Sequence, residues 1–111
     1  MDKVVQKLVA MGVPGLVLLA IAATTGLAGG AALITALSVM GGPFGLMGGV
    51  AAIGLLALAV DAVAEYGFEK IGNEVVKGLQ EDGLSKQEIR KKINGYSMLS
   101  QDLKNKILKV L

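Results

Sequence analysis

The sequence contains neither cysteine nor histidine among its 111 residues, and aromatic residues make up only 4% of it. A chain without cysteine has no thiolate nucleophile and no disulfide, and one without either residue type lacks the usual ligands of zinc. Acid–base chemistry would be left to carboxylates, lysines and hydroxyl groups, and no phosphate-binding glycine motif follows an expected strand. We therefore expect no enzymatic activity, no catalytic residues, no cofactor and no metal ion.

Charge is absent from the whole middle of the chain, because no residue between Lys7 and Asp61 is ionisable. The chain is 53% hydrophobic, and a soluble domain of this size exposes too much of its surface to hide such a stretch easily. The segment 44–64 is long enough to cross a bilayer, which takes about 20 helical residues. We expect residues 8–60 to be helices that are embedded in a membrane or buried in protein.

Glycine and proline divide this apolar region. A first break at Gly12 and Pro14 ends an amphipathic helix, and the strongest break lies at Gly41, Gly42 and Pro43, where the proline suits the first turn of a following helix. We expect a helical hairpin that reverses at these three residues. Two alternatives remain for its first arm: residues 20–40 cross the bilayer while 8–19 lie at its surface, which we favour, or the chain turns again at 26–30.

Beyond Asp61 the second arm becomes amphipathic and is expected to continue to about Gln80, where the sequence Glu-Asp-Gly stops it. The fold class is therefore all-α, with a transmembrane helical hairpin, an amphipathic extension and a small C-terminal helical hairpin. We expect two units: residues 1–80 form the hydrophobic, glycine-rich hairpin with amphipathic ends, and residues 81–111 form a charged helix pair.

The charged helix pair has its own boundary signals. Ser85 and Glu88 have the spacing of a capping box, and Ser100 is a natural N-cap. Gly95 is a natural C-cap for the first helix. These signals predict helices over residues 85–94 and 100–110.

Small residues recur at four-residue spacing in the hairpin. Lipid gives helices no hydrophobic reason to associate, so close backbone approach at small residues is the usual route to packing. The glycines can pack the two arms on each other or can pack one chain on another, and both interpretations stay open. A homo-oligomer is therefore expected, with these residues as its candidate helix-packing positions: Gly26, Gly30, Gly41, Gly45 and Gly49.

Acidic residues form a stripe at the expected membrane edge, with Asp61, Glu65 and Glu69 spaced four apart. In an oligomer they could form carboxylate rings of the kind that select cations in channels. The other interpretation, which we favour, is a solvated helix face beside the bilayer.

Basic residues dominate the C-terminal part, because residues 83–111 contain seven bases and two acids, a net charge of +5. With Lys3 and Lys7 they fit the positive-inside pattern, which places both termini on the cytoplasmic side of what we expect to be the cytoplasmic membrane. They alternate with aliphatic residues at helical spacing, so we expect no nucleic-acid partner. The basic tail comprises Lys86, Arg90, Lys91, Lys92, Lys104, Lys106 and Lys109.

Three glycine-rich runs carry a resemblance to known proteins: TGLAGGAAL from Thr25, MGG from Met40 and GGVAA from Gly48. Residues 22–60 resemble the small-residue hairpins of the interferon-induced 6-16 family and of glycine-zipper membrane proteins generally. Colicin-type pore formers are similar in having an uncharged hydrophobic hairpin beside amphipathic helices. The resemblance implies membrane residence and membrane permeabilisation.

The sequence thus predicts an oligomeric, membrane-inserted protein that forms a pore or perturbs the bilayer, of the toxin, holin or immune-effector type. The alternative is a membrane anchor or scaffold whose C-terminal helices recruit a partner protein. A third possibility is a soluble bundle that hides the hairpin inside an oligomer.

Overall fold

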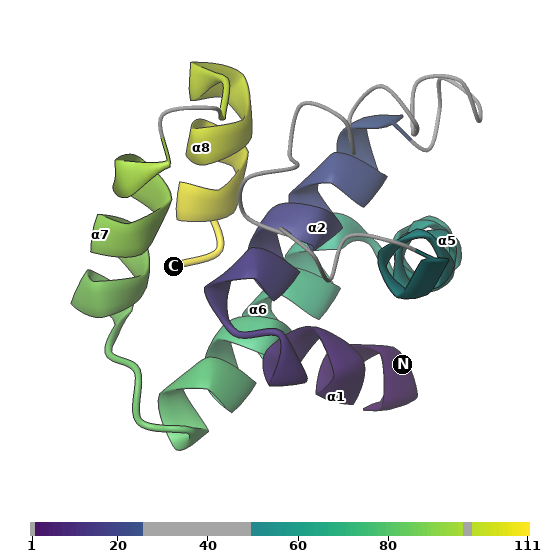
Figure 1. Cartoon of the computed structure of the whole chain (residues 1–111), viewed down its shortest axis with the longest axis horizontal. Helices are drawn as coiled ribbons and strands as arrows, with labels where there is room; N and C mark the ends of the chain where they lie inside the picture. The colour runs from purple at the N-terminus through teal and green to yellow at the C-terminus, as the bar shows by residue number, and fades with distance from the viewer. Residues whose placement is uncertain (1, 26–49, 97–98) are drawn as a thin grey trace.

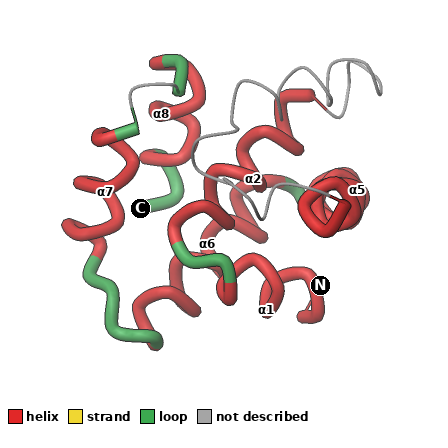
Figure 2. The backbone as a smooth tube through the Cα atoms, viewed as in Figure 1, coloured by secondary structure: helices red, strands yellow, loops and turns green. Residues whose placement is uncertain are grey.

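The computed structural model describes residues 2–25, 50–96 and 99–111, and these residues form helices and no strand (Figures 1 and 2). The prediction of an all-helical chain is confirmed for this part of the protein. The described helices are α1 (Asp2–Ala10), α2 (Val13–Thr25), α5 (Val50–Tyr66), α6 (Phe68–Glu81), α7 (Lys86–Gly95) and α8 (Gln101–Leu108).

Helix α2 runs through the middle of the bundle (Figure 1) and contacts each of the other described helices. Residues 16–21 are at most 1% exposed, and no polar side chain occurs in the helix before Thr24. The Thr24 hydroxyl donates a hydrogen bond back to the Ala20 carbonyl, 2.7 Å away, so it needs no partner from another helix. A helix that is apolar on every side has to be enclosed completely, and the other helices are arranged to enclose it.

The turn between α1 and α2 brings the two helices into backbone contact. Gly12 has φ +77°, a conformation that a side chain disfavours, and a Cβ on Gly15 would collide with the carbonyl oxygen of Leu8. Leu16 and Leu19, which we expected at a bilayer surface, lie in the protein core instead, because the chain turns at Gly12 and α2 packs against α1 and α6.

The prediction that the second arm continues to about Gln80 as one helix is wrong. The chain breaks at Gly67, which has φ +91°, so that α5 is seen end-on in Figure 1 while α6 lies across the view. The buried face of α6, which includes Ile71, Val75 and Leu79, packs against α1 and α2. A straight continuation of α5 would have carried this apolar face away from them.

Two glycines of α6 allow close packing with two other parts of the chain. A Cβ on Gly78 would lie 2.5 Å from Cγ2 of Val9 in α1, and a Cβ on Gly72 would lie 2.9 Å from Cγ1 of Val110. Both distances are too short for real atoms, so the N-terminal helix and the C-terminal residues approach α6 only because side chains are missing there.

The predicted stop after α6 is confirmed at Gly83, which has φ +103°. The Leu84 amide donates to the Leu79 carbonyl and the Gly83 amide donates to the Gln80 carbonyl, both at 3.0 Å. This pair of bonds is the Schellman arrangement, which satisfies carbonyls that the end of a helix leaves without partners.

The predicted boundaries of the last two helices hold within a residue or two. The Glu88 amide donates to Ser85 Oγ at 3.1 Å and the Ser85 amide donates to Glu88 Oε1 at 3.4 Å, which is the expected capping box. Ser100 Oγ accepts from the Leu103 amide at 3.2 Å. The prediction that Gly95 is the C-cap is wrong, because Gly95 is the last helical residue and Tyr96 is the C-cap, in an extended conformation.

The expected hairpin turn at Gly41, Gly42 and Pro43, the alternative turn at 26–30 and the packing glycines Gly26, Gly30, Gly45 and Gly49 lie outside the described residues. Within the described residues, no helix combines the length and the apolar character needed to cross a membrane. The expected boundary between residues 80 and 81 falls at the end of α6, and side chains from both sides of it share one hydrophobic core.

Two helix-interior glycines provide a matched pair for testing this packing. We expect Gly15→Ala to destabilise the protein, because its Cβ meets the Leu8 backbone, which cannot move away as a side-chain end can. Gly54→Ala, where nothing lies within 4 Å of the added Cβ, should stabilise the protein by about 1 kcal/mol through helix propensity. Thermal unfolding followed by circular dichroism measures both, and equal shifts in the two variants would contradict the contact between α1 and α2.

Candidate functional site

The described residues contain no buried polar or charged side chain. No group of three or more acidic, histidine or cysteine residues among them is placed to hold a metal ion. The features that could carry function are therefore the apolar interior and the charged and apolar surfaces around it.

The three acids of the predicted stripe lie on two helices. Asp61 and Glu65 occupy the exposed side of α5, whereas Glu69 lies beyond the Gly67 break, in the first turn of α6. The expectation of one continuous stripe is wrong at Glu69, because the change of direction at Gly67 ends the four-residue register. The Glu69 carboxylate lies instead at the N-terminal end of α6, which is the positive end of the helix dipole.

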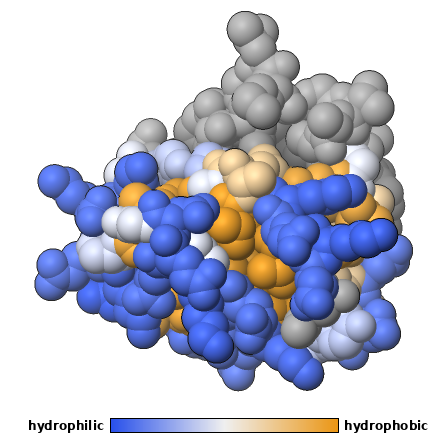
Figure 3. Space-filling model, turned by 90° about the horizontal axis from the view of Figure 1, so that it is seen from below, coloured by the Kyte–Doolittle hydropathy of each residue, from blue (hydrophilic) through white to orange (hydrophobic). Residues whose placement is uncertain are grey.

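The exposed side of α5 also carries apolar surface. Leu58 is 41% exposed, more than any other large hydrophobic side chain of the described residues. With Lys7, Ala10, Gly54 and Leu55 it lines a shallow groove between α1 and α5. Figure 3 looks at the molecule from the side of α1 and shows hydrophobic surface between hydrophilic side chains. Sequence reasoning missed this groove because it forms only when α1 packs beside α5.

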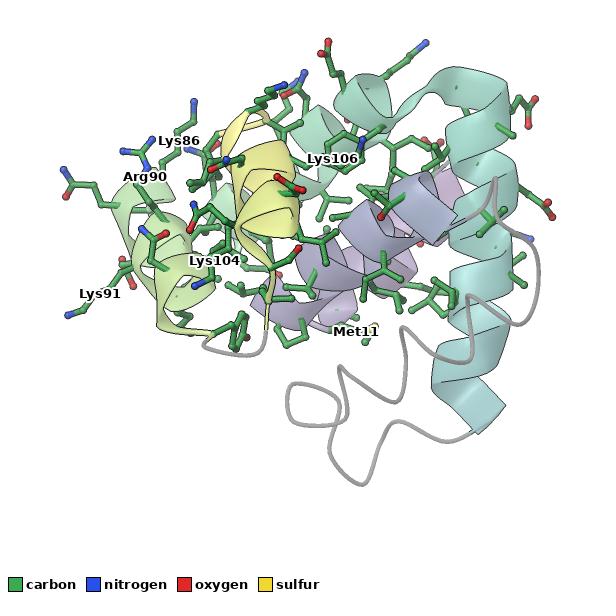
Figure 4. All side chains as sticks on the ribbon, turned by 90° about the horizontal axis from the view of Figure 1, so that it is seen from above. Met11, Lys86, Arg90, Lys91, Lys104 and Lys106 are labelled. Atoms are coloured by element: carbon green, nitrogen blue, oxygen red, sulfur yellow. The ribbon has the colours of Figure 1, made fainter. Side chains whose placement is uncertain are left out.

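Four residues of the basic tail lie on α7 and are all exposed: Lys86, Arg90, Lys91 and Lys92. In Figure 4 the labelled side chains of Lys86, Arg90 and Lys91 project away from the bundle. The opposite side of α7 is apolar and buried through Ile89 and Ile93. The helix is therefore amphipathic, as the alternation of its basic and aliphatic residues at helical spacing indicates.

The remaining basic residues lie on or just after α8 and have different surroundings. Lys104 Nζ donates to the Asn94 carbonyl at 3.3 Å, near the C-terminal end of α7, where a positive charge is favourable. Lys106 Nζ lies 5.1 Å from the centroid of the Phe68 ring. The basic tail is therefore divided into an outward group on α7 and a group on α8 that contacts the rest of the bundle (Figure 4).

Lys106 and Lys109 line a surface hollow of about 550 Å³ at the turn between α5 and α6. The other lining residues come from that turn: Tyr66, Gly67, Phe68, Glu69 and Lys70. Lys70 Nζ lies 5.7 Å from the centroid of the Tyr66 ring. Sequence reasoning missed this site, because Lys70 and Lys106 are far apart in the chain and meet only after the break at Gly67.

Both tyrosines have a raised pKa, for different reasons. The negative charge of Glu65 is the main cause at Tyr66, followed by desolvation and a hydrogen bond to Glu65. Burial alone raises the pKa of Tyr96. A nearby negative charge and a poorly solvated site both disfavour the tyrosinate ion.

Comparison of the chain with protein-family models, with curated proteins and with solved structures finds no match.

The different causes at the two tyrosines are testable by titration. We expect Glu65→Gln to lower the pKa of Tyr66 toward its ordinary value, because the charge that opposes tyrosinate is removed. The pKa of Tyr96 should not change in the same sample, because its cause is burial. NMR of the tyrosine ring carbons at rising pH measures both, and an unchanged Tyr66 would show that Glu65 does not act on it.

Proposed function

We propose that this protein acts on lipid bilayers: it inserts its apolar segment, assembles into oligomers, and forms a pore or perturbs the membrane, as toxins, holins and immune effectors of this size do. The observation that carries the proposal is helix α2, which is apolar on every side and is enclosed by the other described helices. A helix with no polar side is suited either to a protein core or to a membrane.

Moving α2 from the core to lipid would take no charged side chain with it, and the Thr24 hydroxyl would keep its hydrogen bond to the Ala20 carbonyl. Each large side chain of residues 16–21 gains about 1.5–3 kcal/mol from leaving water, and lipid tails are as apolar as the leucines around it. The transfer therefore conserves most of this stabilisation. The chain remains uncharged from the end of α2 to Asp61, so the neighbouring segment would carry no ion into the bilayer either.

The enclosing helices suit the surface of a bilayer. Helices α6 and α7 each bury one apolar side and expose charged residues on the other, which is the pattern of helices that lie at a membrane interface. Lysine and arginine near an anionic surface each contribute about 1 kcal/mol of attraction. We infer that the bundle opens on such a surface, with both termini on the cytoplasmic side of the cytoplasmic membrane.

The second candidate is a membrane anchor whose C-terminal helices recruit another protein. It is favoured by the outward direction of Lys86, Arg90 and Lys91, which leaves α7 free to bind a partner (Figure 4). The two candidates differ in their effect on vesicles, because an anchor binds them without releasing their contents.

A disulfide that closes the bundle tests the opening. The ideal Cβ of Gly72 lies 3.2 Å from the Val110 Cβ, closer than the roughly 3.5–4.5 Å of a disulfide, so the two backbones must move apart slightly for the bond to form. The Gly72→Cys, Val110→Cys variant would tie α6 to the C-terminal end of the chain, and the chain has no native cysteine that could pair with either residue. We expect the oxidised variant to release little dye from vesicles and the reduced variant to release as much as the wild type.

The same protein with and without reductant is its own control, and each single-cysteine variant checks the substitutions. Equal release by the oxidised and reduced forms, with the disulfide intact, would contradict opening. A wild-type protein that binds vesicles of any composition without releasing dye would overturn the pore and favour the anchor.

The acidic residues supply a separate prediction about a pore. Asp61 and Glu65 are exposed on α5, so we expect Asp61→Asn with Glu65→Gln to leave conductance and ion preference unchanged in planar-bilayer recordings. Glu74→Gln with Glu81→Gln on α6 removes the same charge elsewhere and is the matched control. A loss of cation preference in the α5 variant alone would show instead that these carboxylates face a lumen.

A further inference from the structure

We propose that the hollow at the turn between α5 and α6 binds the phosphate group of an anionic lipid headgroup. This inference rests on the proposed function and names the lipid chemistry that would bring the bundle to a membrane. Its evidence is the set of side chains that two distant parts of the chain bring to one depression: three lysines, two aromatic rings and one carboxylate.

The charge of the hollow selects an anion. Lys70, Lys106 and Lys109 contribute three positive charges and Glu69 one negative charge, a net charge of +2 in a single concavity. Concave sites lined by one sign of charge concentrate the opposite ion more than flat surfaces do. The lysines on α7 differ in this respect, because Lys86 and Lys91 project into solvent away from the bundle (Figure 4).

Two of the three lysines of the hollow lie over aromatic rings. Lys106 Nζ lies 5.1 Å from the Phe68 centroid and Lys70 Nζ lies 5.7 Å from the Tyr66 centroid. A cation over a ring keeps its charge and most of its donor hydrogens, whereas a cation in an ion pair has its charge already compensated. Both ammonium groups can therefore donate to phosphate oxygens while the rings hold them at the rim of the hollow.

The rings also favour a headgroup over a dissolved ion. Tyrosine is enriched where a membrane meets water, because its ring prefers the apolar side and its hydroxyl the wet side. Tyr66 and Phe68 are half-buried and lie on either side of Gly67. A lipid phosphate in the hollow would leave its glycerol and first methylene groups against these rings, a contact that inorganic phosphate cannot make.

The experiment compares two pairs of substitutions that remove the same charge. Lys106→Gln with Lys109→Gln empties one side of the hollow, and Lys86→Gln with Lys91→Gln removes two lysines from α7. Co-sedimentation measures partition of the full chain into vesicles of phosphatidylcholine with phosphatidylglycerol, and into vesicles of phosphatidylcholine alone. We expect the hollow variant to lose about 30-fold in partition to the anionic vesicles, about fivefold per lysine, and the α7 variant to lose less than about fivefold.

A second experiment, with soluble ligands, distinguishes a lipid phosphate from free inorganic phosphate. Glycerol phosphate should shift the amide resonances of Gly67 and Phe68 in the wild type and in the α7 variant, and should not shift them in the hollow variant. Lys70→Gln changes an exposed side chain on α6 and should also weaken both vesicle partition and the amide shifts. It is the control for a folding defect in the double variant.

Three results would overturn the inference. Equal loss of partition in the two double variants would indicate diffuse attraction by net charge, and equal partition of the wild type into the two kinds of vesicle would show that anionic lipid is not recognised. The third is that inorganic phosphate shifts the Gly67 and Phe68 amides as glycerol phosphate does, while the hollow variant keeps wild-type partition. The inference and the proposed function can fail separately. Lysine-dependent binding without dye release leaves the hollow as a lipid site and removes the pore. Equal partition of both double variants into the anionic vesicles, together with dye release, keeps the bilayer activity and removes the hollow.

Discussion

The enclosure of α2 is the constraint on which the rest of the described structure depends. This helix has no polar side, so no orientation against a single neighbour would be sufficient, and it contacts every other described helix. The sharp features of the backbone follow from that need. The turn at Gly12 folds α1 back over α2, and the break at Gly67 redirects α6 so that its apolar face reaches α1 and α2 instead of continuing along α5.

Glycine has a different role in the described helices from the one that its spacing in the hairpin predicts. Gly15, Gly72 and Gly78 each lie where another part of the chain approaches too closely for a side chain. They pack helices of one chain together in a protein interior. The glycine-rich runs between residues 26 and 49 keep their predicted role in membrane packing, which the described residues do not test.

The same physical property connects the fold to the proposed function. Among the described residues the core contains no buried polar or charged side chain, so the stability of α2 in the bundle comes mainly from exclusion of its apolar side chains from water, which a bilayer also provides. The helix caps of Ser85 and Ser100 and the cation–ring pairs of Lys70 and Lys106 lie at the surface of the bundle. These are the groups that can meet a headgroup layer while the interior rearranges.

The sequence by itself determined the local structure. The apolar run required burial, and Ser85, Glu88, Ser100 and Gly83 set the ends of helices through hydrogen bonds that span only a few residues. Such signals act within one turn of helix, so they can be read without knowing the fold. The break at Gly67 could not be read in this way, because glycine in a helical pattern becomes a break only when packing elsewhere makes the change of direction favourable.

Tertiary structure alone decided which charges meet. Seven basic residues in one stretch read as a single tail, yet the fold turns those on α7 outward and brings Lys106 and Lys109 to Lys70 and the rings of Tyr66 and Phe68. Lys70 and Lys106 belong to helices that are brought together by burial of their apolar faces, α6 against α2 and α8 against α2. The hollow is thus a consequence of enclosing α2, and its lysines have no local sequence signal because the interaction that positions them is the packing of the opposite sides of their helices.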